Sequence, residues 1–341
     1  MEHLERSLKA QLLQRIAPIE EHPLQFTSVS NPTVRSTDVL IRIKACGVCH
    51  SNLHMIEGEF RIFGSPAKLP IIPGHEITGV IEALGKDVEN WHLGQRVGVQ
   101  VLYEACGTCE FCLAGREQLC VNEKVTGESV DGGYAEFIAA PSNFIYPVPD
   151  NLGDEEAAPL FCPGVTAYRA VRRANVQMGN KVVVMGVGGV GHMSLQFAKL
   201  AGAEVIAVDR SPSALNLARE LGANYMISPA ELDGHLAKSG KPDVILVHAP
   251  AQAAIDQAFR SIKKGGTVLM AVLGNVSVVF PQEYTIQTSV IGTRSDMLET
   301  LKIASAGKVK VISKSYPLSE ASTILERLKR GEITGRAILV P

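Results

Sequence analysis

The sequence predicts an α/β protein with two parts, a β-rich part followed by a doubly wound parallel sheet. Its 341 residues suffice for two domains, because one domain takes about 150 residues. Residues 39–146 are short β-branched runs separated by Gly, Pro and Asn, a pattern typical of strands and turns. From Lys181 onward, buried strands alternate with helical patterns, which favours βαβ units on a parallel sheet.

The β-rich part contains four clear strand regions, which read DVLIRIKACGV, GHEITGVIEALG, GQRVGVQV and GGYAEFIAA. The Pro-rich residues 141–160 follow and are interpreted as a connector. Before the first strand, Leu4, Leu8 and Leu12 recur every four residues. This spacing favours a short helix that packs on the body or contacts another subunit.

The second part begins with a strand at Lys181–Met185, and further strands are predicted at residues 204–209, 243–249 and 267–272. Helical patterns separate them at residues 192–203, 211–223 and 253–266, and two more surround residues 297–306 and 319–330.

The charge balance excludes several classes of partner. Lysine and arginine number 33 and aspartate and glutamate 35, so the net charge is −2. Nucleic acids and anionic membranes select basic surfaces, so neither is expected as a partner. No apolar stretch reaches the roughly 20 residues of a membrane span, and residues 1–16 lack the apolar core of a signal peptide. We therefore expect a cytoplasmic protein whose seven cysteines are thiols or metal ligands.

A glycine-rich G-x-G-x-x-G motif links a strand to a helix at residues 186–191, and its residues are Gly186, Gly188, Gly189, Val190 and Gly191. The glycines allow a tight turn and a close approach of backbone N–H groups to a pyrophosphate at the helix N-terminus. Asp209 ends the next strand, where an acid can bond the adenosine ribose. The motif predicts a Rossmann dinucleotide-binding domain. A turn that binds nothing is the alternative.

The residues at the end of that second strand bear on which dinucleotide binds. Asp209 repels a 2′-phosphate, which favours NAD over NADP. Arg210 is adjacent and could stack on the adenine or tolerate the phosphate. NAD is therefore the expected cofactor.

Four cysteines lie within fifteen residues, at Cys106, Cys109, Cys112 and Cys120. Four thiolates around one Zn²⁺ form a closed tetrahedral site, which stabilises a loop and leaves no position for a substrate. An iron–sulfur cluster also uses four cysteines, but its usual spacings differ. The spacing therefore predicts a structural zinc site.

A second set of possible ligands is dispersed along the chain. Cys49, His75 and Cys162 offer two thiols and an imidazole, and two cysteines with one histidine can form a catalytic zinc site with an open fourth position. Spacing alone does not select these three from seven cysteines and nine histidines.

The motifs taken together resemble the zinc-dependent medium-chain alcohol dehydrogenases of the microbial type, from which the Cys₂His ligand set is known. The resemblance rests on GVCHSNLH, PGHE, the four-cysteine segment, FCPGVTAY, VMGVGGVGHMSLQFAKLAGA and GRAILVP. These motifs occur in the family's order from about residue 38 to the C-terminus. The family implies a GroES-like β-rich catalytic domain at residues 1–155 and 293–341, with a Rossmann domain at residues 156–292 between its two segments.

The resemblance also implies roles for individual residues. It makes Cys49, His75 and Cys162 the catalytic zinc ligands, and Glu76 an acid that exchanges with the bound water. Ser51 takes the alcohol proton and His54 is the solvent end of that relay. The implied cofactor contacts are His50 and Arg336 at the phosphates, Thr166 at the nicotinamide, and Leu273. Leu102 and Leu273 are expected to border the substrate pocket.

One residue departs from the family pattern. Most relatives carry Asp after the Ser of the CHS motif, whereas this chain has Asn52. In the family that carboxylate orients the histidine ligand and adds negative charge. Asn52 can accept a hydrogen bond but adds no charge, so the sequence predicts a more electrophilic or less tightly held zinc.

Other titratable residues have structural interpretations. Cys46 precedes Cys49 by three residues but is interpreted as a small residue that ends a strand. His248 is interpreted as a core or rim residue. The histidines expected at the surface are His3, His22, His92, His192 and His235.

The expected activity is interconversion of alcohols and aldehydes or ketones by hydride transfer to and from NAD(H), with two zinc ions per chain and a small-molecule substrate. A homotetramer is implied, with a dimer as the fallback. Two alternatives are a polyol or sugar-alcohol dehydrogenase of the same fold and a non-catalytic NAD-binding redox sensor. Cys162 argues against the first, because such relatives usually carry Glu there, and the complete ligand and relay positions argue against the second.

Overall fold

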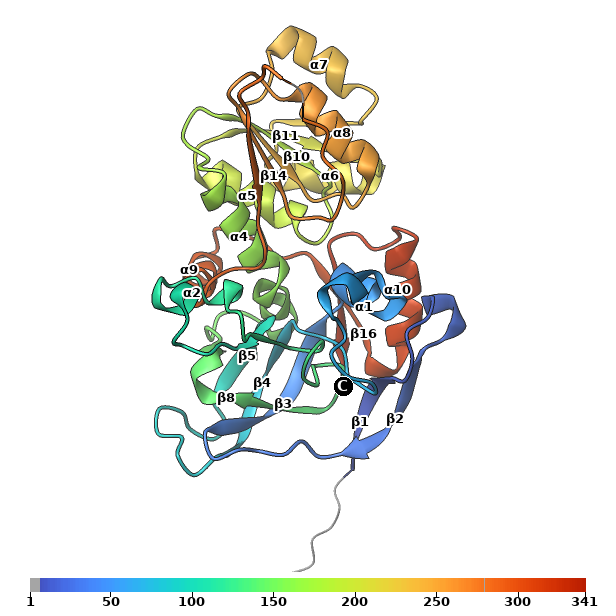
Figure 1. The fold of residues 1–341 in the computed structure, drawn as a ribbon, viewed down its shortest axis with the longest axis vertical. Coiled ribbons are helices and arrows are strands. Elements are labelled where there is room, and N and C mark those ends of the chain that lie inside the picture. Colours follow the sequence, from blue (N-terminus) through green and yellow to red (C-terminus); the bar gives the residue numbers. More distant parts are fainter. Residues whose placement is uncertain (1–6, 279) are drawn as a thin grey trace, which may run out of the picture. The chain divides into compact units, whose positions relative to one another are not determined.

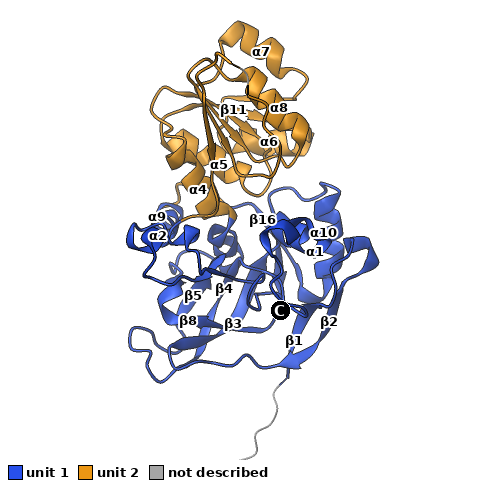
Figure 2. Ribbon diagram, viewed as in Figure 1, with its two compact units in different colours: residues 1–162, 293–305, 311–341 blue, residues 163–292, 306–310 orange. Residues whose placement is uncertain are grey.

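The structure is a computed structural model that describes residues 7–278 and 280–341. The chain divides into two compact units, shown in Figure 2. Unit 1 holds residues 1–162, 293–305 and 311–341, and unit 2 holds residues 163–292 and 306–310. The chain therefore leaves unit 1, builds most of unit 2 and returns.

A seven-stranded sheet is the centre of unit 1 (Figure 1). Its order is β16 (Ser313–Pro317), β17 (Arg336–Val340), β3 (Asp38–Gly47), β4 (Ile77–Leu84), β5 (Arg96–Val99) and β9 (Ile145–Pro147), and β8 (Phe137–Pro141) also pairs with β3. β3 buries Ile41, Ile43 and Ala45 on one face, as alternation along a strand requires.

Leu8 and Leu12 belong to a strand, so the short helix predicted there is wrong. β1 (Ser7–Leu13) pairs antiparallel with β2 (Leu24–Ser30), and Leu8 and Leu12 lie in β1. Residues four apart share a face of a strand as well as of a helix, so leucine spacing does not separate the two. Ala10 bridges to Ala135 and Leu13 to Ile71 in the body of unit 1. Leu4 lies outside the described residues.

Residues 141–160 are not a simple connector, because they contain β9 and a short helix. The remaining elements of unit 1 are the β-ladder β6 (Leu102–Glu104) with β7 (Lys124–Val125), the helices α1 (His50–Glu57), α2 (Glu110–Leu113), α3 (Asp154–Ala157), α9 (Arg294–Ser305) and α10 (Ala321–Lys329), and the 3₁₀ turns η1 (Ile19–Glu21), η2 (Glu59–Phe63), η3 (Glu117–Leu119), η4 (Ser142–Phe144), η5 (Ala158–Phe161) and η6 (Leu318–Glu320).

Unit 2 is a six-stranded parallel sheet. Its order is β12 (Tyr225–Ile227), β11 (Glu204–Val208), β10 (Lys181–Met185), β13 (Val244–Val247), β14 (Thr267–Met270) and β15 (Thr285–Thr288). The helices are α4 (Pro163–Arg173), α5 (Gly191–Leu200), α6 (Pro212–Glu220), α7 (Leu232–Ser239) and α8 (Gln252–Ser261). The strand order reverses between β10 and β13, which makes the end of β10 a ligand-binding position in such sheets.

The buried strands of unit 2 follow the predicted apolar runs. Every residue of β13 is buried, and β10 and β11 are buried apart from their first residues. α5 buries most of its residues instead of one face.

The unit boundary differs from the expected one at two places. Residues 156–162 cluster with unit 1, and residues 306–310 with unit 2. Phe161 explains the first difference, because its ring lies against Tyr146 of β9 with centroids 6.1 Å apart and fills the space beside Gly98 of β5. No helix among the described residues is long and apolar enough to cross a membrane.

Candidate active site and metal centres

Cys49, His75, Glu76 and Cys162 converge inside unit 1 from three separate segments. Cys49 precedes α1, His75 and Glu76 precede β4, and Cys162 follows η5. One ligand atom from each of the four lies within 4.8 Å of the others, and all four residues are buried. The structure therefore brings together the three proposed ligands and the neighbouring acid that the sequence separates by up to 113 residues.

The spacing of the two thiols fits a zinc ion. Two sulfurs on a tetrahedral Zn²⁺, each about 2.3 Å from the metal, lie about 3.8 Å apart. The sulfurs of Cys49 and Cys162 are 3.7 Å apart. The hydrogen bond from Cys162 lowers the pKa of Cys49, and Arg336 and His75 act in the same direction. The site thus favours a thiolate at Cys49, whereas the same hydrogen bond and burial raise the pKa of Cys162.

Glu76 and Arg336 form a buried ion pair beside these thiols. Arg336 Nε donates to Glu76 Oε2 at 3.0 Å, and its Nη2 donates to Oε1. Burial raises the pKa of Glu76 to about 7, and Arg336 opposes that rise. Gly47 leaves room for the carboxylate, because a Cβ there would lie 1.9 Å from Glu76 Oε2. In this structure the partner of Arg336 is therefore Glu76, and the Arg336 side chain is only 6% exposed.

Both ring nitrogens of His75 have neighbours from α1. Nε2 lies 3.3 Å from Ser51 Oγ, and Nδ1 lies 3.4 Å from Asn52 Nδ2. Asn52 is fully buried. The residue that replaces the family's aspartate thus lies directly against the histidine of the metal-binding set.

His54 lies one turn along α1 from Ser51, near the surface. Its Nδ1 is 2.7 Å from Glu59 Oε2, and its ring centroid lies 5.0 Å from that of His50 and 5.4 Å from that of Phe60, with the rings tilted. The His54 side chain is 20% exposed and that of Glu59 53%. Burial and the neighbouring His54 lower the pKa of His50. Sequence reasoning missed Glu59, whose position two residues past the end of α1 gave no signal by itself.

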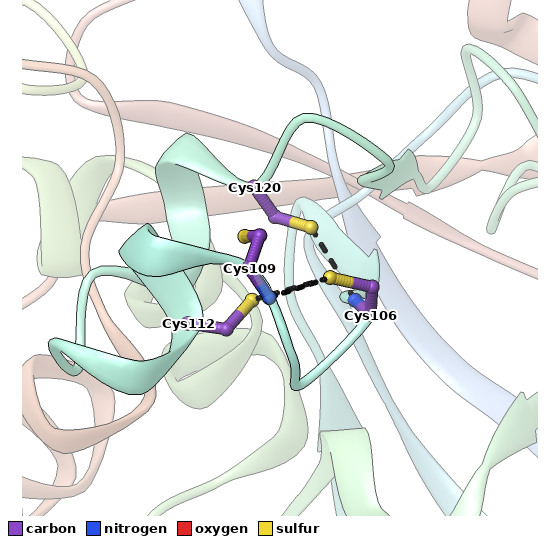
Figure 3. Close-up of side chains that lie close together, drawn as sticks. All are labelled: Cys106, Cys109, Cys112 and Cys120. Atoms are coloured by element: carbon purple, nitrogen blue, oxygen red, sulfur yellow. Dashed lines mark hydrogen bonds between the residues drawn. The ribbon is translucent and has the colours of Figure 1, made fainter.

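The four cysteines of the second set surround a single space in unit 1 (Figure 3). Cys109 and Cys112 belong to the turn of α2, whereas Cys106 follows β6 and Cys120 follows η3. The sulfurs of Cys106 and Cys112 are 3.9 Å apart, close to the tetrahedral spacing of about 3.8 Å. The backbone N–H groups of Asn122 and of Cys106 both donate to Cys120 Sγ.

Hydrogen bonds from the loop lower the pKa of Cys106 and Cys109, whereas burial and the bond to Cys109 raise the pKa of Cys112. Bonds from the backbone and side chain of Thr108 lower the pKa of Cys106 to about 6. The backbone N–H of Cys109 donates to Cys106 Sγ at 3.4 Å. Such N–H···S bonds are made by loops that wrap a thiolate-bound ion.

The glycine-rich loop lies at the end of β10 in unit 2. Gly186 has φ +91°, and a Cβ there would lie 2.7 Å from the backbone nitrogen of Ala249. A Cβ at Gly191 would lie 1.8 Å from Gly186 O. A Cβ at Gly188 would meet nothing within 4 Å. Packing within the protein thus explains Gly186 and Gly191, while Gly188 leaves open space that a close-lying ligand can use.

Asp209 holds the same loop from the end of β11. Its carboxylate accepts from the Val187 N–H at 2.7 Å and from the Ser211 N–H at 2.9 Å. The other expected cofactor residues of unit 2 differ in exposure: Arg210 is exposed, Leu273 is 46% exposed, and Thr166 lies in α4 with 8% exposure.

Two predictions about single residues are wrong. His192, expected at the surface, is fully buried, and its Nδ1 lies 2.9 Å from Gly188 O, so it supports the glycine loop. Leu102, expected in the substrate pocket, is fully buried in β6 and cannot border an open pocket. His248 is a rim residue whose Nε2 lies 2.9 Å from Ser194 Oγ. His22 and His92 are exposed, His235 is half-buried, and His3 lies outside the described residues.

Comparisons with known proteins identify the family. Residues 35–150 match the family described as the alcohol dehydrogenase GroES-like domain, and residues 189–306 match that described as zinc-binding dehydrogenase. An alcohol dehydrogenase of Geobacillus stearothermophilus is 41% identical over 93% of this chain and 96% of its own. The chain belongs to the zinc-binding alcohol dehydrogenases. An NAD-dependent alcohol dehydrogenase of Sulfurisphaera tokodaii is 35% identical over 94% of this chain and 97% of its own.

A solved structure of a zinc-binding alcohol dehydrogenase agrees with the fold. The cobalt- and zinc-bound thermostable alcohol dehydrogenase of Pyrobaculum aerophilum is 27% identical, covers 98% of this chain and 100% of its own, and superposes with a TM-score of 0.89. The GroES-like and Rossmann fold classes predicted from the sequence are therefore confirmed.

We expect the Glu76–Arg336 pair to matter for the stability of this alcohol dehydrogenase. Arg336→Met leaves a buried carboxylate without its partner, which costs about 3–5 kcal/mol of unfolding free energy. Denaturant unfolding followed by the fluorescence of Trp91, the single tryptophan and a residue of unit 1, measures the loss.

Two comparisons control that measurement. Glu76→Gln combined with Arg336→Met removes both charges and should recover a large part of the loss. Arg42→Met breaks a pair with Glu82 in which both side chains are 46% exposed, and should cost less than about 1 kcal/mol. A loss for Arg336→Met as small as that for Arg42→Met would contradict the assignment.

Proposed function

We propose that this chain is an NAD-dependent, zinc-dependent alcohol dehydrogenase that interconverts alcohols with aldehydes or ketones. The observation that carries the proposal is the buried convergence of Cys49, His75 and Cys162, with two sulfurs 3.7 Å apart and a hydroxyl beside the imidazole. Relatives named as alcohol dehydrogenases, one of them NAD-dependent, support it along nearly the whole chain.

Cys49, His75 and Cys162 are the residues that would hold the catalytic Zn²⁺. When bound there, Zn²⁺ supplies a Lewis acid that lowers the pKa of an alcohol or polarises a carbonyl. The fit rests on the donor set, the sulfur spacing and the thiolate that Arg336 and His75 favour at Cys49. Glu76 is proposed to approach the same centre during ligand exchange, and its bond to Arg336 sets how readily it can do so.

Ser51 and His54 are proposed as the two ends of a proton path on α1. Ser51 Oγ is 3.3 Å from His75 Nε2, so it lies beside the converging ligand atoms and can accept the proton of an alcohol. His54 is three residues further on the same face of the helix and reaches solvent. The Glu59 carboxylate lies 2.7 Å from His54 Nδ1, so an acidic group stands at the solvent end of the proposed path.

Unit 2 is proposed to bind NAD through residues 186–191. The open space at Gly188 lets backbone N–H groups approach a pyrophosphate, and the Asp209 carboxylate disfavours a 2′-phosphate. His50, Thr166, Leu273 and Arg336 are proposed as further cofactor contacts by their match to the family. For Arg336 this contact would have to be made while the residue also serves Glu76.

The Cys106, Cys109, Cys112 and Cys120 set is proposed to hold a second, structural zinc ion. All four positions are thiols, so no ligand position remains for a substrate. The N–H···S bonds to Cys106 and Cys120 support this, because they stabilise thiolates in a loop that has little apolar packing of its own.

Neither alternative has comparable support. A polyol dehydrogenase would be expected to carry Glu at the third ligand position, where this chain has Cys162. A non-catalytic NAD-binding sensor would not need Ser51 beside the imidazole or His54 on the exposed side of the same helix.

Self-association is proposed as well, with a homotetramer expected and a dimer as the fallback. β15 is an edge strand of the sheet in unit 2, and its backbone pairs on one side only with β14. Ile286 of β15 is 38% exposed, and Val278, Phe280 and Val290 nearby in sequence are more than half exposed. An exposed edge strand with exposed apolar side chains in and beside it is a surface that proteins usually cover.

The function is tested by turnover and metal content together. We expect NAD-linked oxidation of a panel of primary and secondary alcohols, with two zinc ions per chain. Ser51→Ala should keep both ions and lose roughly 10²–10⁴-fold in kcat, as removal of an acid–base group does. Mild chelation should abolish activity and release one ion, while the four-thiolate ion resists. Full activity with one ion per chain would contradict the two-site proposal, and no turnover at any metal content would contradict the function.

Asp209 is expected to select NAD. Asp209→Ser removes repulsion of a 2′-phosphate and lets Arg210 attract it, so the preference should move toward NADP by about 1–3 kcal/mol in the ratio of the two kcat/KM values. Both values should also fall, because Asp209 bonds the N–H groups of Val187 and Ser211. Asp233→Ser, an exposed change in α7, is the control. A wild-type protein that already prefers NADP would refute this role.

The oligomer is tested by light scattering. We expect the wild-type particle to have four times the chain mass of 36.6 kDa. Ile286→Lys introduces a charge on the exposed edge strand and should lower that mass, while Lys238→Glu on α7 should leave it unchanged. A wild-type monomer would contradict self-association, and twice the chain mass would establish the dimer.

A further inference from the structure

The phenol of Tyr134 completes a buried chain of polar groups that ends at His75. Tyr134 Oη donates to Asn52 Oδ1 at 3.1 Å, and Asn52 Nδ2 lies 3.4 Å from His75 Nδ1. Tyr134 and Asn52 are 0% exposed and His75 is 1% exposed. Water therefore does not substitute for any of these contacts.

The position of Tyr134 is determined from both sides of its backbone. Its N–H donates to Pro73 O at 2.9 Å, and its carbonyl accepts from the Gln11 N–H at 2.8 Å. Gly74, the residue before His75, has φ +98°, and a Cβ there would lie 2.4 Å from Tyr134 Cδ1. The glycine thus admits the ring directly beside the segment that carries His75, and the ring has no room to withdraw.

The direction of the Asn52 amide decides which nitrogen of His75 carries the proton. With Nδ2 toward His75, Nδ1 acts as the acceptor, and the proton of the neutral ring is on Nε2. A neutral imidazole that offers Nε2 to a metal ion carries its proton on Nδ1 and needs an acceptor there. Asn52 supplies that acceptor only when its amide turns to bring Oδ1 to His75. A carboxylate would accept with either oxygen and would not need to turn.

Tyr134 can hydrogen-bond to the Asn52 amide in either orientation of that amide. Its hydroxyl donates to Oδ1 in the direction seen here and can accept from Nδ2 when the amide is turned. Without the hydroxyl, the turned amide would bury an N–H donor with no partner, whereas the unturned amide would lack only one donor to its carbonyl. A buried N–H group without an acceptor is rarer in proteins than a buried carbonyl that lacks one of its donors.

We propose that Tyr134 is a positioning residue for metal loading, which acts by giving the Asn52 amide a hydrogen-bond partner when the amide turns to the direction that gives His75 the metal-binding tautomer. The proposal rests on the proposed function in that zinc is taken to bind Cys49, His75 and Cys162. The proposal explains how an amide can occupy a position where the family pattern has a carboxylate. The phenol of Tyr134 can donate to the amide or accept from it, so Asn52 has a hydrogen-bond partner besides His75 in either orientation.

The test is a double-mutant cycle on zinc release. Zinc-loaded wild type, Tyr134→Phe, Asn52→Asp and the double variant are mixed with a chromogenic chelator, and the faster-released ion is followed. Tyr134→Phe should speed its release about 10-fold, at the lower end of the 10–100-fold typical of changes behind a ligand. Asn52→Asp should slow it. When Asn52→Asp is already present, loss of the phenol should change the rate by less than about 3-fold, because a carboxylate accepts from His75 in either direction.

Equal effects of Tyr134→Phe in both backgrounds, or no effect in either, would overturn the proposal, since a merely structural role predicts equality. Tyr103→Phe is the matched control, because Tyr103 is a core tyrosine of unit 1 whose hydroxyl donates to Ala139 O at 3.0 Å. It should leave zinc release unchanged. If the wild type holds no releasable zinc at this site, the proposed function fails. That outcome is distinguishable from failure of the role proposed for Tyr134, which requires zinc to be present.

A second measurement does not depend on any variant folding. ¹⁵N chemical shifts of the His75 ring in the wild-type protein report which nitrogen carries the proton. We expect Nε2 to be protonated in the metal-free protein and Nδ1 in the zinc-loaded protein. A proton on Nδ1 in both forms would show that the amide does not turn and would overturn the proposal.

Discussion

Glu76 and Arg336 form an ion pair inside unit 1, beside two thiols. Their carboxylate and guanidinium groups have almost no solvent access. Removing either charge from water alone costs several kcal/mol, so each requires the other. Arg336 begins β17, which pairs with β3, and Glu76 precedes β4 on the other side of β3. The pair therefore joins the last strand of the chain to the strands that bring Cys49 and His75 together, and its positive member favours the Cys49 thiolate.

This arrangement accounts for the discontinuous course of the chain. Arg336 is 260 residues from Glu76, so the chain must return to unit 1 after building unit 2. The return through α9, β16, α10 and β17 places the last strand of the chain between β16 and β3 in the sheet of unit 1. Unit 2 has its own core and its own ligand-binding loop, and the bonds of Asp209 and His192 that hold this loop are made within unit 2.

The net charge around the candidate zinc ligands depends on the residues beside them. Two thiols, a carboxylate and an imidazole lie beside one guanidinium, and the group behind the imidazole is the neutral Asn52. One negative charge fewer in a buried site lowers the desolvation cost of the whole set. The same change removes an acceptor that works in any direction, and the phenol of Tyr134 stands where it can compensate.

The sequence by itself determined what depends on neighbours along the chain. The strand at Lys181–Met185, the glycine loop after it and the four cysteines within fifteen residues needed only local spacing, because a turn and a metal-binding loop are built from residues close in sequence. The choice of Cys49, His75 and Cys162 needed the family resemblance as well, since spacing alone does not group residues so far apart in the sequence. Tertiary structure alone decided that the leucines near the N-terminus form a strand, that Arg336 meets Glu76, that His192 is buried, and that Tyr134 reaches Asn52 across 82 residues. These depend on which strands pair and which rings fill the space between them, and no periodicity within a single segment carries that information.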